Sequence, residues 1–91
     1  MSSMRRLGFV GVVIDNRAEQ AAKVQSVLTD FGERILARTG LPHSPSGTSV
    51  ITLVIEASTE ELGALTGRLG NLEGVSVKSM LSKLPTSEDD R

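Results

Sequence analysis

Residues 7–14 (LGFVGVVI) constrain the fold most strongly, because this short run is apolar on both faces of an extended chain. One alternating set is Leu7, Phe9 and Val13, and the other is Val10, Val12 and Ile14. Enrichment in β-branched residues over a short run predicts a strand. Two apolar faces predict a central strand that is covered on both sides.

A helix is expected next, from Arg17 to about Phe31. Asp15 and Asn16 end the strand, and Asn16 with Glu19 three residues later forms a candidate capping pair. Apolar residues recur at three- and four-residue spacing and form one stripe. The stripe consists of Ala21, Val24, Val27, Leu28 and Phe31, with Gln20, Lys23 and Gln25 off it, and Gly32 follows as a stop.

Two further strands follow this helix. Residues 33–39 (ERILART) have the mixed composition of an edge strand, with Ile35 and Ala37 on one face and Arg38 on the other. Residues 40–47 hold two prolines and two glycines, which predicts a loop. Residues 48–57 (TSVITLVIEA) alternate clearly and predict a strand with one fully apolar face.

The last two elements are a helix and a strand. Ser58 and Glu61 form a capping box that opens a helix ending at Gly70. Residues 75–81 alternate as a final strand. We therefore expect one domain over residues 6–83, followed by a disordered acidic tail over residues 84–91.

The order of elements predicts an α+β, ferredoxin-like βαββαβ sandwich. Right-handed crossovers give a four-stranded antiparallel sheet in the order 4-1-3-2, with both helices on one face. The other face has no helix to cover it, although the first strand is apolar on both sides and Val50 and Val54 lie on the second side of the third. An exposed apolar patch usually marks an interface. We expect a homo-oligomer, a dimer or tetramer, that assembles through the sheet.

Composition disfavours several classes of function. The net charge is −1 and Phe9 and Phe31 are the two aromatic residues, so direct nucleic-acid binding is not expected. No apolar stretch approaches the ~20 residues of a membrane span. The absence of cysteine agrees with a cytoplasmic location.

No catalytic machinery is evident. His43 is the single histidine and there is no cysteine, so neither a metal site within one chain nor a cofactor is expected. Gly8 and Gly11 lie inside a strand, where they leave room for a neighbouring backbone or a partner subunit. The carboxylates Glu60 and Glu61 are explained better by capping than by acid–base catalysis. We expect a protein that is not an enzyme.

Glycines in the second helix are unusual. Each interior glycine costs about 0.5–1 kcal/mol relative to alanine. Gly63 and Gly67 are four residues apart and share a face, which would permit close approach by a ligand or another backbone. Tight packing on the sheet or frayed helix ends are the alternatives.

The chain resembles a family of short bacterial proteins described as iron-only hydrogenase system regulators. The resemblance covers Arg6 to about Lys83 and is carried by RLGFVGVVIDNR, by RTGLP with GTSVITLV, and by ELGALTGRLGNLEGVSVKSM, in which residues 65–78 (LTGRLGNLEGVSVK) are the most telling stretch. The family is ACT-like and similar to the C-terminal regulatory domain of nickel-responsive repressors, which implies a ferredoxin-like fold that assembles through its sheet. The nickel site of those repressors needs several histidines and a cysteine and does not carry over.

The resemblance implies a regulator that senses a small molecule at a subunit interface, near the turn from the first strand to the first helix. Asp15, Asn16 and Arg17 would then be polar ligand contacts and residues 40–47 a lid, with a simple helix cap as the alternative. His43, Gly63 and Gly67 are further candidate contacts. A protein-interaction or assembly module without a small ligand is the second hypothesis. Nickel-responsive repressors bind DNA through an N-terminal ribbon-helix-helix, whereas about six residues precede the first strand here. Direct DNA binding is therefore not expected.

Overall fold

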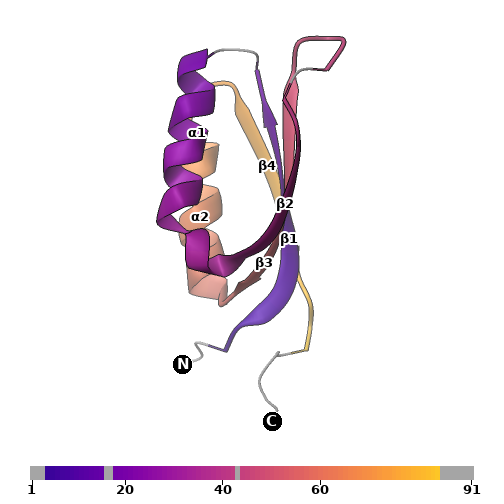
Figure 1. Cartoon of the computed structure of the whole chain (residues 1–91). Coiled ribbons are helices and arrows are strands. Elements are labelled where there is room, and N and C mark those ends of the chain that lie inside the picture. Colours follow the sequence, from indigo (N-terminus) through magenta and orange to yellow (C-terminus); the bar gives the residue numbers. More distant parts are fainter. Residues whose placement is uncertain (1–3, 16–17, 43, 85–91) are drawn as a thin grey trace.

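The computed structural model describes residues 4–15, 18–42 and 44–84 as an α+β structure with one sheet and two helices. The elements are β1 (Arg6–Ile14), α1 (Ala18–Asp30), a 3-10 turn (Gly32–Arg34), β2 (Ile35–Leu41), β3 (Ser49–Ala57), α2 (Thr59–Gly70) and β4 (Val75–Leu81). The strands are antiparallel in the order β2-β3-β1-β4, which is the predicted order counted from the other edge. Both helices cover the same face of the sheet (Figure 1).

The core lies between this sheet face and the helices. On β1 the inward side chains are Val10, Val12 and Ile14, which are all buried, as the alternation of residues 7–14 predicts. Opposite them, β3 contributes Ile51, Leu53 and Ile55. The helices supply Val24, Val27 and Leu28 from α1 and Leu65 and Leu69 from α2.

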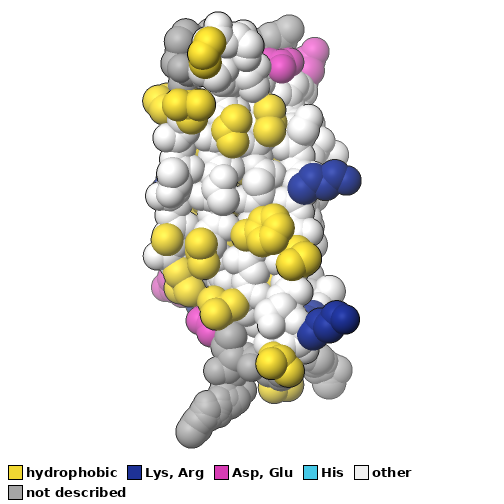
Figure 2. Space-filling model, turned by 90° about the vertical axis from the view of Figure 1, so that its right-hand side faces the viewer, with side chains coloured by type: hydrophobic (Ala, Val, Ile, Leu, Met, Phe, Trp, Pro, Cys, Tyr) yellow, Lys and Arg dark blue, Asp and Glu magenta, His cyan; other side chains and the backbone are white. Residues whose placement is uncertain are grey.

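The helix-free face of the sheet is also apolar. Phe9 at its centre pairs with Val54 on one side and with Met80 on the other, and these side chains are 43%, 43% and 60% exposed. Figure 2 shows hydrophobic side chains distributed over this face, with Lys and Arg toward one side. The predicted second apolar side of β1 and β3 is therefore present, and no described residue covers it.

A β-bulge in the edge strand β2 overturns the predicted faces of its residues. Ile35 pairs with Ile55, but Ala37 already pairs with Val54, so Leu36 is an extra residue on β2. Directly opposed residues of antiparallel strands share a face. Ile35 thus faces the helices while Ala37 faces away from them. The prediction that these two share a face is wrong, because the bulge shifts the alternation by one residue.

Helix α1 agrees with the predicted stripe except at one residue. Val24, Val27 and Leu28 are buried, but Gln20, expected off the stripe, is also buried at 4% exposure, and its Oε1 atom has no hydrogen-bond partner among the residues that the structure describes. It lies one turn before Val24, on the same side of the helix. The predicted start at Arg17 and its Asn16 cap lie outside the described residues.

Helix α2 begins as predicted. The Ser58 hydroxyl accepts a hydrogen bond from the Glu61 amide at 3.1 Å, and the Glu61 carboxylate accepts one from the Ser58 amide at 2.9 Å. Together these bonds form the capping box. They satisfy two backbone donors that the first turn of a helix leaves without partners.

Two glycines permit the backbone geometry at the two ends of β4. A Cβ atom on Gly8 would overlap the Met80 carbonyl oxygen and lie 2.9 Å from Leu81 Cα, so Gly8 permits the close pairing of β1 with β4. Gly74 has a φ of +78°, a conformation that favours glycine, in the turn that leads into β4. The predicted need for close backbone approach is confirmed at Gly8, whereas a Cβ on Gly11 would be 3.9 Å from its nearest neighbour.

Neither described helix combines the length and the apolar character that a membrane span requires. Of the predicted tail over residues 84–91, residues 85–91 lie outside the described part of the chain.

Candidate ligand-binding site

A hollow of about 370 Å³ lies between α1 and the edge of the sheet formed by β2 and β3. It is at the end of the sheet where β1 ends and where the β2–β3 loop begins. Its apolar lining residues are Ile14, Ala21, Pro42, Val50 and Ile51, and its polar ones are Gln25, Arg38 and Ser49, with Gly40 between them. Hollows of roughly this size commonly hold small molecules.

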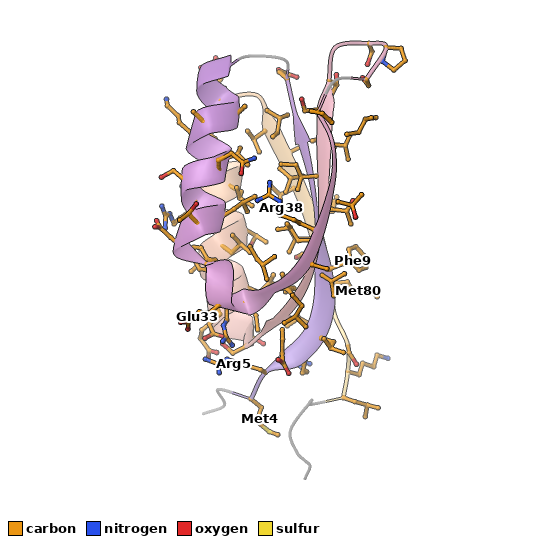
Figure 3. All side chains as sticks on the ribbon, viewed as in Figure 1. Met4, Arg5, Phe9, Glu33, Arg38 and Met80 are labelled. Carbon is orange, nitrogen blue, oxygen red and sulfur yellow. The ribbon has the colours of Figure 1, made fainter. Side chains whose placement is uncertain are left out.

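Arg38 enters this hollow because of the bulge in β2. The shift places Arg38 opposite Leu53, a core residue, and therefore on the helix side of the sheet. Figure 3 shows its side chain directed from β2 toward α1. Its Nη2 atom donates a hydrogen bond to Gln25 Oε1 at 3.1 Å. The guanidinium is thus oriented by a neutral amide and keeps other donors for a ligand.

Gly40 keeps the hollow open. It lies opposite Ile51 on the same side of β2 as Arg38, and it has no side chain to fill the space. A Cβ atom there would be 3.8 Å from the Val50 carbonyl oxygen, which is an ordinary van der Waals contact. The chain could accommodate a larger residue at this position, and the open space depends on the glycine.

The loop after β2 is held by hydrogen bonds beside the hollow. The Ser49 hydroxyl donates to the Pro42 carbonyl oxygen at 2.5 Å. Ser44 accepts a bond from the Thr48 amide through its hydroxyl at 3.1 Å and from the Gly47 amide through its carbonyl at 2.9 Å. These bonds position Pro42 at the hollow. Of the predicted lid, Gly40 and Pro42 line the site.

Among the predicted contacts on the β1–α1 turn, Asp15 can be located. Its amide donates to the Gly74 carbonyl oxygen at 2.9 Å, and its carboxylate lies beside Gly74. Asp15 thus adjoins the turn into β4 and is not among the lining residues of the hollow. Asn16, Arg17 and His43 lie outside the described residues.

Gly63 and Gly67 lie on α2, and neither lines the hollow. Both are exposed, and a Cβ atom on either would meet no atom of the described residues within 4 Å beyond the backbone of its own helix. Tight packing on the sheet is therefore the wrong explanation for these glycines, whereas frayed helix ends stay an alternative. The structure does not bring them together with Asp15, and ligand contact at Gly63 and Gly67 stays a prediction.

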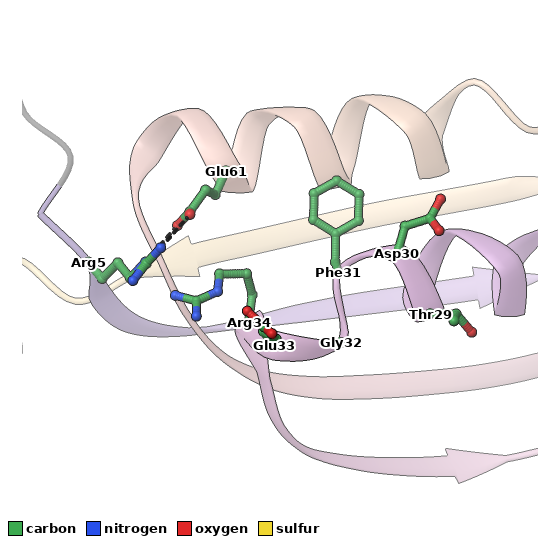
Figure 4. Close-up of a pocket in the computed structure, with 8 residues that line it drawn as sticks. All are labelled: Arg5, Thr29, Asp30, Phe31, Gly32, Glu33, Arg34 and Glu61. Atoms are coloured by element: carbon green, nitrogen blue, oxygen red, sulfur yellow. Dashed lines mark hydrogen bonds and ion pairs between the residues drawn. The ribbon is translucent and has the colours of Figure 1, made fainter.

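A second hollow, of about 550 Å³, lies at the opposite end of β1 between the end of α1 and the start of α2 (Figure 4). Arg5, Asp30 and Glu61 of its lining are held in ion pairs, and Arg34 donates a long hydrogen bond to the Glu56 carbonyl oxygen at 3.4 Å. Arg5 contacts the Glu61 carboxylate at 2.9 and 3.1 Å, and Asp30 contacts Arg68 at 2.9 Å. The hydrogen bond from Arg5, with that from the Ser58 amide, lowers the pKa of Glu61 to about 2.

At the larger hollow, these ion pairs join α2 to the end of α1 and to the segment before β1, whereas the smaller hollow holds the Arg38 guanidinium, hydrogen-bonded to Gln25, above an apolar floor. Among the described residues, no group of three His, Cys, Asp or Glu side chains is arranged to hold a metal ion.

Sequence reasoning missed Arg38 and Gln25 as residues of the smaller hollow. It placed Arg38 on the strand face opposite Ile35 and Ala37, and Gln25 off the apolar stripe of its helix. An extra residue in a strand has no clear sequence signature, so the placement of Arg38 was not accessible from alternation. The Gly40 and Pro42 positions were signalled by the loop composition alone.

Comparisons with known proteins agree with this architecture. The TM1266-like family model, described as "Iron-only hydrogenase system regulator, putative", matches residues 6–79. The structure of uncharacterized protein TM1266 from Thermotoga maritima is 33% identical with a TM-score of 0.83, and the match covers 87% of this chain and 99% of that one. The ACT domain from GTP pyrophosphokinase of Chlorobium tepidum has a TM-score of 0.70 at 18% identity, with 87% and 100% covered. No curated protein matches the sequence.

Proposed function

This chain belongs to the TM1266-like family of iron-only hydrogenase system regulators, and from that premise we propose that it is a non-enzymatic regulatory module that senses a small molecule and assembles with further copies through its sheet. The observation that carries the proposal is the 370 Å³ hollow between α1 and β2, with its oriented Arg38. The fold is that of an ACT domain.

The edge strand β2 offers a physical route from ligand to assembly. Gly40 lines the hollow on the helix side, and its neighbour Leu41 is 52% exposed and lies opposite Val50. Successive residues of a strand point to opposite faces. A ligand that displaces β2 by contact near Gly40 would therefore move Leu41 on the helix-free face, where copies of the chain would meet.

A thermal-shift screen of amino acids and small metabolites tests the sensing function. A ligand at ten times its dissociation constant contributes about 1.4 kcal/mol, which corresponds to roughly 6–11 °C for a domain of this size. We expect at least one compound to raise the melting temperature of the wild type but not that of Gly40→Val, whose side chain fills the hollow. Gly70→Ala, at the exposed end of α2, is the matched control and should respond like the wild type. A screen in which no compound acts would contradict the proposal.

Assembly is tested separately by sedimentation velocity at micromolar concentration. We expect a species larger than the 9.7 kDa chain. A stable monomer would contradict assembly through the sheet. It would not bear on the sensing function, which the thermal-shift screen tests by itself.

A protein-interaction module is the second candidate, and the open edge of β2 favours it. Leu36, the bulge residue, is 55% exposed on this edge. An extended segment of another protein could add to such an edge as a strand. Capture of a partner by the wild type, lost in Leu36→Pro and unaffected by Gly40→Val, would support this candidate over small-molecule sensing.

A further inference from the structure

We propose that the hollow between α1 and β2 binds a small monocarboxylate that has a short apolar body and no ammonium group, such as a branched 2-oxo acid. This inference rests on the proposed function, because it names the chemical class of the effector for the same site.

The carboxylate is inferred from Arg38. Among the described residues that line the hollow, Arg38 is the charged one, and the polar side chains beside it are the Gln25 amide and the Ser49 hydroxyl. A guanidinium has five N–H donors in a planar fork that matches the two oxygens of a carboxylate. The hydrogen bond to Gln25 uses Nη2 and orients the group toward α1. The remaining donors suit one carboxylate at the mouth of the hollow.

The apolar body is inferred from the floor. Ile14 and Ile51 are 2% and 6% exposed, and Ala21 and Pro42 add further apolar surface. A volume of about 370 Å³ is near the lower end for ligand pockets. The described lining contains neither an aromatic ring for a nucleobase nor a second cation for a phosphate. A short aliphatic chain fits this surface best.

The absence of an ammonium group is inferred from the acceptors. Gln25 Oε1 already accepts from Arg38, and the Pro42 carbonyl oxygen accepts from the Ser49 hydroxyl. The described lining contributes no carboxylate. Bringing an ammonium ion into a partly apolar hollow without a carboxylate to balance its charge is costly. The site therefore discriminates between an acid and the amino acid of the same shape.

Isothermal titration of the full chain at low ionic strength tests this with three probes that share a branched body. They are 3-methyl-2-oxobutanoate, which has the carboxylate alone, valine, which has both groups, and isobutylamine, which has the ammonium alone. We expect the 2-oxo acid to bind at least tenfold more tightly than valine, and isobutylamine to give no binding.

Variants then connect the binding to the residues. Arg38→Gln should weaken binding of the 2-oxo acid at least tenfold, while Arg38→Lys should retain part of the affinity because the charge is kept and the planar fork is lost. Gly40→Val should abolish binding, and Gly70→Ala should leave it unchanged. Circular dichroism and the melting temperature verify that each variant is folded.

The outcomes separate the ligand class from the function. If valine, or a compound without a carboxylate, binds as tightly as the 2-oxo acid or more tightly at a site blocked by Gly40→Val, the inferred class is overturned and the sensing function stands. Equal binding by the wild type and Arg38→Gln would overturn the role of Arg38. If neither these probes nor the metabolite screen gives any binding, the sensing function fails together with the ligand class.

Discussion

The two faces of the sheet carry side chains of similar apolar character, but one is covered and the other is open. On the helix side, Val10 and Val12 of β1 are completely buried, whereas Phe9 and Val13 on the other side of the same strand are 43% and 42% exposed. The helices bury the side chains on the first side. They do not reach the second, since both lie against one face (Figure 1).

This difference teaches that apolar alternation identifies which faces of a strand are apolar, and not whether or by what they are covered. A small domain buries a limited share of its surface, and this chain nevertheless places many of its apolar residues on a second face that the helices leave open. The covered face should determine whether the chain folds, and the open face whether copies assemble. Four predictions test this division.

The largest effect is expected within the covered face. Leu53 is fully buried, whereas its neighbour Val54 points to the open face. Leu53→Ala should lower the free energy of unfolding by about 2–5 kcal/mol because it leaves a cavity, and Val54→Ala should cost less than about 1 kcal/mol. Urea unfolding at equal protein concentration measures both values. Equal losses would show that the two faces do not differ in this way.

The next effect concerns assembly through the open face. Phe9 lies at its centre, between Val54 and Met80. Phe9→Ser should weaken self-association by about 2 kcal/mol, or roughly 30-fold in the dissociation constant, as expected for a central aromatic contact. Sedimentation equilibrium measures the change, and Lys23→Ser on the exposed side of α1 serves as the control. Association that is unaffected by the loss of Phe9 would exclude this face as the interface.

A smaller effect distinguishes two glycines of β1. Gly8→Ala would force its new methyl group against the Met80 backbone, and we expect a loss of about 1–3 kcal/mol. Gly11→Ala, with 3.9 Å of space, should fold as stably as the wild type. Thermal unfolding of the two variants measures the difference. If they are equally stable, the close pairing of β1 with β4 is not a requirement of the fold.

The smallest effect is a pH dependence at the helix that helps to cover the first face. The pKa of Glu61 falls from an ordinary 4.5 to about 2 through the hydrogen bonds from Arg5 and the Ser58 amide. A lowered folded-state pKa means that the carboxylate contributes its stabilisation above pH 4.5 and loses it as the pH falls toward 2. Glu61→Gln keeps a capping side chain without the charge, so its stability should vary less over that interval. Urea unfolding between pH 2 and 6 measures both slopes, and parallel curves would contradict this account.

Much of the fold was accessible from the sequence, because the signals that define it are local. The strand from Val75 to Leu81 and the capping box of Ser58 and Glu61 were predicted at the observed residues. The two apolar faces of β1 were also predicted. Each depends on residues close together in the chain, whose alternation or spacing reflects their own geometry.

The candidate site was less accessible, because it depends on contacts between distant segments. Gln25 and Arg38 meet through the packing of α1 beside β2, and the Arg38 position depends on the extra residue in β2. Gln20 shows the same limit, since its polar side chain gave no sign of burial within α1. Propensity and alternation describe one helix or strand at a time, and they cannot predict contacts between different elements.

The bulge at Leu36 has a consequence for how related sequences are compared. Ile35, Ala37 and Arg38 pair with the consecutive residues Ile55, Val54 and Leu53, so a relative that lacks only Leu36 would have an uninterrupted ladder with Ala37 and Arg38 on the same sides as here. Its guanidinium would stay on the helix side, at the hollow, and the helix-free face would gain no charge. A gap of a single position at Leu36 therefore preserves the chemistry of both sides of the sheet, whereas an alignment that moves this gap past Arg38 would pair residues that face opposite sides.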